Sequence, residues 1–180
     1  MDPAVTAALI SVPVTITAAG AAFAAGLVQG RAARRGPVGA VRRQHKRDAY
    51  ATLLVALHAY DRETDPSDCE KQARAEFQAS GAHYTPEDLG RRMLELVAAV
   101  PIREVLKAQA LVELEGPEGV ADPSTEAMVA VCEVHYGAVY AHRRASIGVA
   151  ERAFLDDHDK LYPAISKFTA AASKELNRAD

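Results

Sequence analysis

Residues 3–30 read PAVTAALISVPVTITAAGAAFAAGLVQG, a run of 28 residues without a charged side chain. A helix needs about 20 predominantly apolar residues to cross the hydrocarbon core of a bilayer. This stretch is long enough, although it is rich in Ala and contains Ser, Thr and Pro13. We therefore expect a single transmembrane helix over residues 1–30, and this expectation sets the organisation of the rest of the chain.

A basic collar follows the apolar run, over residues 31–47. Its members are Arg31, Arg34, Arg35, Arg42, Arg43, Lys46 and Arg47. Up to Arg47 the chain has seven basic residues and one acid, a net charge of +6, whereas the remainder has 14 basic and 23 acidic residues, a net charge of −9. Basic residues next to a span favour the cytoplasmic side and anionic lipid. The pattern predicts a single-pass protein of the cell membrane with a cytoplasmic body, whose collar contacts membrane lipid.

Other interpretations of the apolar run and the collar remain open. The run resembles a cleaved signal peptide in its small residues, but no basic segment precedes it and basic residues follow it. It also fits a buried core helix. The collar fits nucleic acid poorly, because residues 31–47 contain no aromatic side chain on which bases would stack.

Small and weakly polar residues recur along one face of the predicted span. They are Ser11, Thr15, Ala18, Ala22, Ala25 and Gln29, with Gly26 and Gly30 forming a G-x-x-x-G pair. Small faces allow helices to approach closely in lipid. Ser11, Thr15, Ala22, Gly26 and Gly30 are therefore candidates for helix association in a homo-oligomer, with an Ala-rich composition as the plain alternative.

Residues 48–180 show apolar repeats of helical period, and the expected fold class is all-α: the transmembrane helix followed by an antiparallel cytoplasmic helical bundle. Helices are expected over 38–60, over 67–79 with a capping box from Ser67 and Glu70, and from Thr85 onward. Pro101 divides that third helix. The stretch from Leu111 to Leu114 alternates briefly but is interpreted as a helix end.

A long fourth helix is expected over residues 123–154, capped by Asp122 and Pro123, and a last helix follows it. The apolar seam of the fourth helix is expected at Met128, Cys132, His135, Val139, His142, Ser146, Val149 and Ala153.

The motifs of nucleotide-binding, protease and hydrolase sites are absent from the sequence, and its two cysteines lack metal-ligand spacing. We expect no cofactor and no catalytic residues. His135, His142 and His158 fall on apolar seams, and three histidines from a bundle can form a zinc-type site. A seam histidine is more often a core residue with a hydrogen-bonding partner, so the main expectation is no metal. The function that remains is a non-enzymatic scaffold or protein-interaction role, with a self-associating membrane assembly or a histidine-based metal-binding bundle as alternatives.

Three segments beyond the collar pattern carry a resemblance: residues 2–10 (DPAVTAALI), 47–54 (RDAYATLL) and 110–117 (ALVELEGP), together with the closing stretch from Phe168 to Leu176. With these segments the chain resembles small membrane-anchored α-helical proteins of actinobacteria. The resemblance covers most of the chain and implies the fold and the location stated above. It implies no activity and supplies no functional residues.

Overall fold

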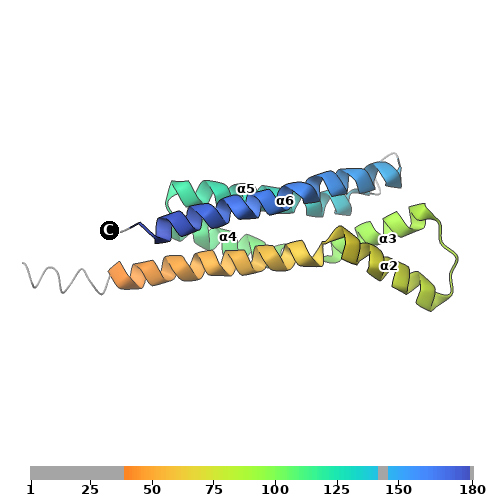
Figure 1. Cartoon of the computed structure of the whole chain (residues 1–180), viewed down its shortest axis with the longest axis horizontal. Coiled ribbons are helices and arrows are strands. Elements are labelled where there is room, and N and C mark those ends of the chain that lie inside the picture. The colour runs from red at the N-terminus through yellow and green to blue at the C-terminus, as the bar shows by residue number, and fades with distance from the viewer. Residues whose placement is uncertain (1–38, 142–145, 179–180) are drawn as a thin grey trace, which may run out of the picture. The chain divides into compact units, whose positions relative to one another are not determined.

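The computed structural model describes residues 39–141 and 146–178. In these ranges every regular element is a helix (Figure 1), so the all-α prediction is confirmed for them. None of the helices in these ranges has the length and apolarity needed to cross a membrane. The predicted transmembrane helix, with its candidate association residues Ser11, Thr15, Ala22, Gly26 and Gly30, lies outside the described residues.

The first described helix covers residues 39–63 and is called the 39–63 helix. Its inward stripe is fully or almost fully buried and consists of Ala49, Tyr50, Leu53, Leu57 and Tyr60. The first turns of the helix lie outside this stripe, because Val41 is 55% exposed and His45 is exposed as well. At the other end the buried Thr64 hydroxyl donates to the Tyr60 carbonyl at 2.8 Å. This bond binds a polar side chain to the last helical turn.

Helix α2, Pro66–Ser80, begins with a different cap from the predicted one. The Asp65 side chain accepts a hydrogen bond from the Asp68 backbone N–H at 3.0 Å, and Pro66 occupies the first helical turn. The prediction of Ser67 as the cap is therefore wrong: Ser67 is already helical. Asp is as good a cap as Ser, and Pro at the first position needs no N–H donor. Gly81 ends the helix with φ +66°, a left-handed conformation that glycine adopts without strain.

Helices α3, Pro86–Ala99, and α4, Arg103–Glu115, confirm the predicted division at Pro101. The predicted helix start at Thr85 is confirmed, and Thr85 forms a reciprocal capping box with Asp88. The stretch from Leu111 to Leu114 is the end of helix α4, also as predicted.

Helices α5, Glu118–Val139, and α6, Ile147–Leu176, replace the predicted single helix over 123–154 and the shorter one after it. That prediction is wrong at both ends. Pro117 is the N-cap, and Pro123 lies inside α5 rather than at its start. The chain leaves the helix at Tyr140 and a new helix begins after Ser146, whose hydroxyl accepts from the Val149 N–H at 3.4 Å.

The break also moves the core seam of α5. The buried residues of this helix include Ala127, Val131, Val134 and Ala138, whereas the predicted seam member Val149 is 53% exposed on α6. Cys132 and His135 are only half-buried, and Met128 is buried as predicted. The apolar repeat of a helix cannot be extended through residues where the chain changes direction.

Residues from His45 onward form one compact unit, and residues 39–44 are counted with the unit before it. Within the larger unit α5 and α6 lie antiparallel along their length (Figure 1). The 39–63 helix is antiparallel to α6, because Lys46 pairs with Glu175 and Asp61 lies beside His158. Phe168 meets Tyr50 edge to face, with ring centroids 6.2 Å apart. Each fully buried large apolar side chain contributes about 1.5–3 kcal/mol to folding before entropy is counted, so this shared core supports the bundle.

Candidate functional site

A groove opens where α3 meets the end of α5 and the start of α6, and its volume is about 460 Å³. This volume lies in the range of small-ligand and peptide pockets. Its lining residues are Glu87, Arg91, Leu94, Glu95, Ala98, Ala138, Val139, Ala141, Ser146 and Ile147.

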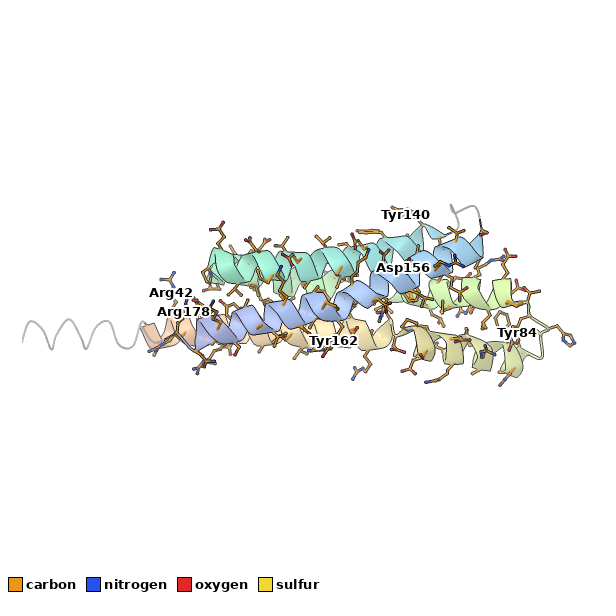
Figure 2. The ribbon with its side chains drawn as sticks, turned by 45° about the horizontal axis from the view of Figure 1, so that its top comes forward. Arg42, Tyr84, Tyr140, Asp156, Tyr162 and Arg178 are labelled. Atoms are coloured by element: carbon orange, nitrogen blue, oxygen red, sulfur yellow. The ribbon has the colours of Figure 1, made fainter. Side chains whose placement is uncertain are left out.

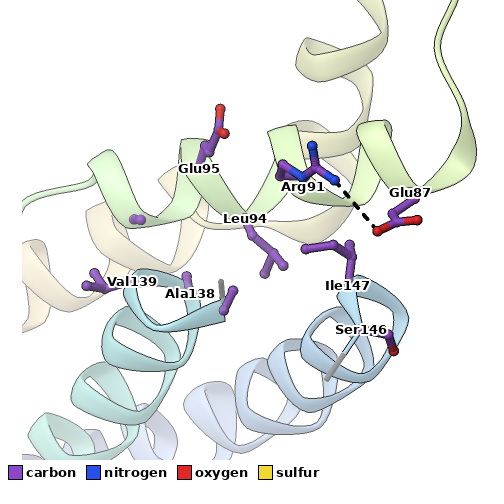
Figure 3. Close-up of a pocket in the computed structure, with 10 residues that line it drawn as sticks. Glu87, Arg91, Leu94, Glu95, Ala138, Val139, Ser146 and Ile147 are labelled. Atoms are coloured by element: carbon purple, nitrogen blue, oxygen red, sulfur yellow. Dashed lines mark ion pairs between the residues drawn. The ribbon is translucent and has the colours of Figure 1, made fainter. Parts of the chain in front are cut away.

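The floor of the groove is apolar, and helix packing at one glycine holds it in shape. Figure 3 shows the side chains of Leu94 and Ile147 directed into the space between α3 and the helix ends. Gly90, one turn before Leu94, is buried against α6. A Cβ atom at Gly90 would lie 2.9 Å from Glu151 Oε2 and 3.1 Å from Ile147 Cγ2. The glycine therefore allows α3 and α6 to approach closely beside the groove.

The rim of the groove on α3 carries charges that pair along the helix. Arg91 lies 3.6 Å from the Glu87 carboxylate (Figure 3) and 3.8 Å from that of Asp88. Glu95 pairs with Arg92 at 2.8 Å. Hydrogen bonds from Thr85 lower the pKa of Asp88, so this carboxylate stays charged in mild acid. Exposed ion pairs within a helix contribute little to stability. A binding partner can therefore replace them with ion pairs of its own at a small cost in free energy.

Two exposed tyrosines lie near the C-terminal end of α5, the end that contributes to the groove. Tyr136 and Tyr140 are stacked, with ring centroids 6.1 Å apart and planes 16° apart, and both are more than two-fifths exposed. Val139, which lines the groove, is the residue before Tyr140. Figure 2 shows Tyr140 and Arg178 toward opposite ends of the bundle. Exposed tyrosines next to an apolar hollow are typical of protein interfaces.

The groove residues form a binding arrangement, and their polar groups already have structural partners. Ser146 is the hydroxyl among them, and it caps α6. Glu87 and Arg91 pair with each other, and Glu95 pairs with Arg92. Nucleophilic catalysis needs a nucleophile within hydrogen-bond reach of a base, and the contacts described for Ser146 are those of a cap.

The candidate histidines lie on different helices. His158, on α6, has its Nε2 atom 3.9 Å from the Asp61 carboxylate and packs beside Phe154. His135, on α5, contacts Tyr136 edge to face. His142 lies outside the described residues. Within the described ranges, no three His, Cys, Asp or Glu side chains come together as a metal site would require.

The surroundings of His135 favour its neutral form. Burial lowers its pKa, and a hydrogen bond to the Val100 backbone opposes this shift in part. Its Nδ1 atom is buried without a hydrogen-bonding partner among the described residues. Desolvation disfavours the charged form of a histidine. The pKa of His135 therefore depends on how closely α5 packs against Val100, in the connection between α3 and α4.

The collar residues that the structure describes are Arg42, Arg43, Lys46 and Arg47; Arg31, Arg34 and Arg35 lie outside the described residues. Arg42, Arg43 and Arg47 are exposed. Lys46 donates to Glu175 on α6 at 2.8 Å, and this contact lowers the pKa of Glu175. One collar residue thus has a structural role in closing the first helix onto the last.

Sequence reasoning missed two cations at this end of the bundle. Lys174 and Arg178 follow on the last turn of α6 and just beyond it, on either side of Glu175. Their place in the sequence, more than 120 residues after Arg47, gives no hint that they lie near it. Only the antiparallel return of α6 brings them there.

Comparisons with known proteins add no relative to this picture: no family model, no curated protein and no solved structure matches the chain. The fold and the groove therefore define the molecule only as an all-α bundle with a candidate binding surface.

Proposed function

We propose that this chain is a membrane-anchored, non-enzymatic helical protein that binds a protein partner through the groove of α3, α5 and α6. The observation that carries the proposal is the apolar floor of Leu94 and Ile147, with the stacked and exposed pair Tyr136 and Tyr140 at the same end of α5. Desolvated apolar pockets next to aromatic side chains supply most of the affinity at protein interfaces.

The position of the groove supports an anchored role. Helix α5 has 22 residues and is therefore about 33 Å long. The groove lies at its C-terminal end, whereas the contact between Lys46 and Glu175 lies near its N-terminal end. We propose that the groove end serves the partner and that the Lys46 end, which follows the predicted anchor in sequence, serves the membrane.

The anchor is tested by extraction and protease access. The full chain should resist alkaline carbonate and require detergent, and protease should reach the body only from the cytoplasmic side. A fragment that begins at Ala40 should be soluble and helical. Recovery of the full chain in the carbonate wash would remove the anchor from the proposal.

The partner is tested by placing a photo-crosslinking amino acid at Val139, in the groove, in the full chain expressed in its host cells. A matched probe at Val55, which is 71% exposed on the 39–63 helix, controls for random collisions. We expect one discrete adduct from Val139, none from Val55, and loss of the adduct when Ile147→Glu is added. The same adducts from both positions, or none from either, would contradict the proposal, and an adduct of twice the chain mass identifies a second copy as the partner.

A further inference from the structure

The last turn of α6 is fixed beside the first turns of the unit that begins at His45. Lys46 Nζ lies 2.8 Å from Glu175 Oε1, and Arg178 lies 3.7 Å from Glu175 Oε2. Both side chains of the Lys46–Glu175 pair are less than a quarter exposed. The Glu175 carboxylate therefore contacts two cations that are far apart in sequence, Lys46 and Arg178.

The neighbouring cations keep their charge available to a ligand. Arg47 and Lys174 are exposed and have no ion-pair partner in the part of the chain that the structure describes. Arg47 lines a groove of about 370 Å³ with an apolar wall that includes Ala51, Leu54 and Leu176. Lys174 and Arg178 line a second groove, between α6 and the start of α5.

We propose that Lys46, Arg47, Lys174 and Arg178 form one surface that contacts anionic phospholipid headgroups, here called the lipid-facing edge. The inference rests on the proposed function, because the predicted anchor and collar precede these residues directly. It adds Lys174, on the last turn of α6, and Arg178, just beyond that helix, to the proposed membrane contact.

Acidic residues at the same end have to be weighed against these cations. Glu113 and Glu115 end α4 and Glu118 begins α5, and Gly116 between the two helices lies against Tyr50. An anionic surface repels these carboxylates and attracts the cations of the 39–63 helix and α6. The proposed headgroup contact therefore belongs to these cations and not to the carboxylates, although Lys174 and Arg178 share their groove with Pro117 and Gly119.

The chemistry of this edge fits lipid better than nucleic acid. Headgroup phosphates need exposed cations beside an apolar surface, and the first groove offers Arg47 beside Ala51, Leu54 and Leu176. Single-stranded nucleic acid needs exposed aromatic rings for stacking, and the aromatic ring in this groove, Tyr50, is buried.

The test uses the full chain with one tryptophan, Asn177→Trp, since the natural chain has none. The protein is reconstituted in vesicles of phosphatidylcholine alone or with phosphatidylserine, each containing a lipid with a nitroxide-labelled headgroup. Quenching should be stronger in the anionic vesicles. The double reversal Lys174→Glu with Arg178→Glu should bring the quenching in anionic vesicles down to the value in neutral vesicles.

The matched control reverses two exposed cations elsewhere, Arg62→Glu with Arg152→Glu, and should leave the quenching unchanged. The neutral variant Lys174→Gln with Arg178→Gln should give an intermediate value, and circular dichroism shows whether each variant keeps its helices. Equal quenching in neutral and anionic vesicles, or equal effects of both reversals, would overturn the lipid-facing edge.

Failure of the anchor is recognised separately. A chain that washes off in carbonate refutes the anchor, and flotation of that chain with anionic vesicles still decides the lipid contact. A chain that resists carbonate but shows no dependence on phosphatidylserine refutes the lipid-facing edge alone. Binding to an oligonucleotide that depends on Lys174 and Arg178, without binding to anionic vesicles, would assign the surface to nucleic acid instead.

Discussion

At the scale of single residues, Gly116 is required by contacts and not by its own backbone angles. Its φ of −90° is open to any amino acid. A Cβ atom there would lie 2.7 Å from the Val112 carbonyl oxygen and 3.3 Å from the Tyr50 hydroxyl. The carbonyl belongs to the backbone of α4 and cannot turn aside, whereas a flexible side chain would.

We therefore expect Gly116→Ala to lower the free energy of unfolding by about 1–3 kcal/mol. The matched control is Gly119→Ala, because a Cβ atom at Gly119 meets nothing within 4 Å. Alanine is favoured over glycine in a helix, so the control should be neutral or stabilising by up to about 1 kcal/mol. Urea unfolding followed by circular dichroism measures both, and equal losses in the two variants would refute the contact argument.

The lowered pKa of His135 makes stability depend on pH. The folded state favours the neutral imidazole, so its contribution is complete above the ordinary histidine pKa of about 6.5 and is lost as the pH falls through the lower pKa of the folded state. We expect the free energy of unfolding to decrease from about pH 7.5 to about pH 5. His135→Gln, which cannot become charged, should flatten part of this decrease in urea titrations at each pH. An unchanged pH profile in this variant would show that another group is responsible.

At the scale of the helices, the start of α2 offers a direct test of which side chain caps it. Asp65→Ala removes the acceptor for the Asp68 N–H and should cost about 1 kcal/mol. Ser67→Ala, in the first turn of the helix, should change stability by less than about 0.5 kcal/mol. Thermal or urea unfolding of the two variants distinguishes them. A larger loss from Ser67→Ala would restore the cap that the sequence pattern predicted.

The elements that could be predicted from sequence are those with a local signal. Thr85 before Pro86 specifies the start of α3, and Pro101 specifies its division from α4, because both act on their own backbone. The α5–α6 break has no such signal. Residues 140–146 contain neither glycine nor proline, and Pro123, which looked like a helix start, is tolerated inside α5.

The candidate site was beyond the reach of these local signals. The groove forms where α3 meets the end of α5 and the start of α6. The predicted helix over residues 123–154 ran through both of these helix ends, so no signal in the sequence indicated that they meet α3. The sequence reasoning did not single out Leu94, and its place in the groove depends on Ile147 being the first residue of a new helix. Lys174 and Arg178 likewise acquire a role only through the antiparallel return of α6.

At the scale of the whole molecule, the bundle has two ends with different chemistry. One end carries the groove and the exposed tyrosines, and the other carries the Lys46–Glu175 contact with its neighbouring cations. The long antiparallel pair α5 and α6 connects them. The proposed partner site and the proposed lipid contact are therefore separated by the length of α5, about 33 Å.

The Lys46–Glu175 pair should contribute to the stability of the whole bundle, because it joins the first helix of the compact unit to the last. Its side chains are 22% and 17% exposed, so solvent screens it less than the outer pairs. Glu175→Gln should lower the free energy of unfolding at neutral pH by about 1 kcal/mol. The Lys167–Glu126 pair between α6 and α5 has a similar distance, 2.7 Å, but both side chains are about half exposed. Glu126→Gln should therefore have a smaller effect.

The same pair should respond to acid in a definite direction. Lys46 lowers the pKa of Glu175 in the folded state, so the contribution of the pair is present above the ordinary glutamate pKa of about 4.3 and is lost as the pH falls through the lower folded value. The difference between the parent and Glu175→Gln should be constant from about pH 7 to about pH 5 and should vanish below about pH 3. Urea titrations at a series of pH values measure this difference. A difference that persists in acid would mean that Glu175 contributes through packing, and that the first and last helices of the unit are joined without the ion pair.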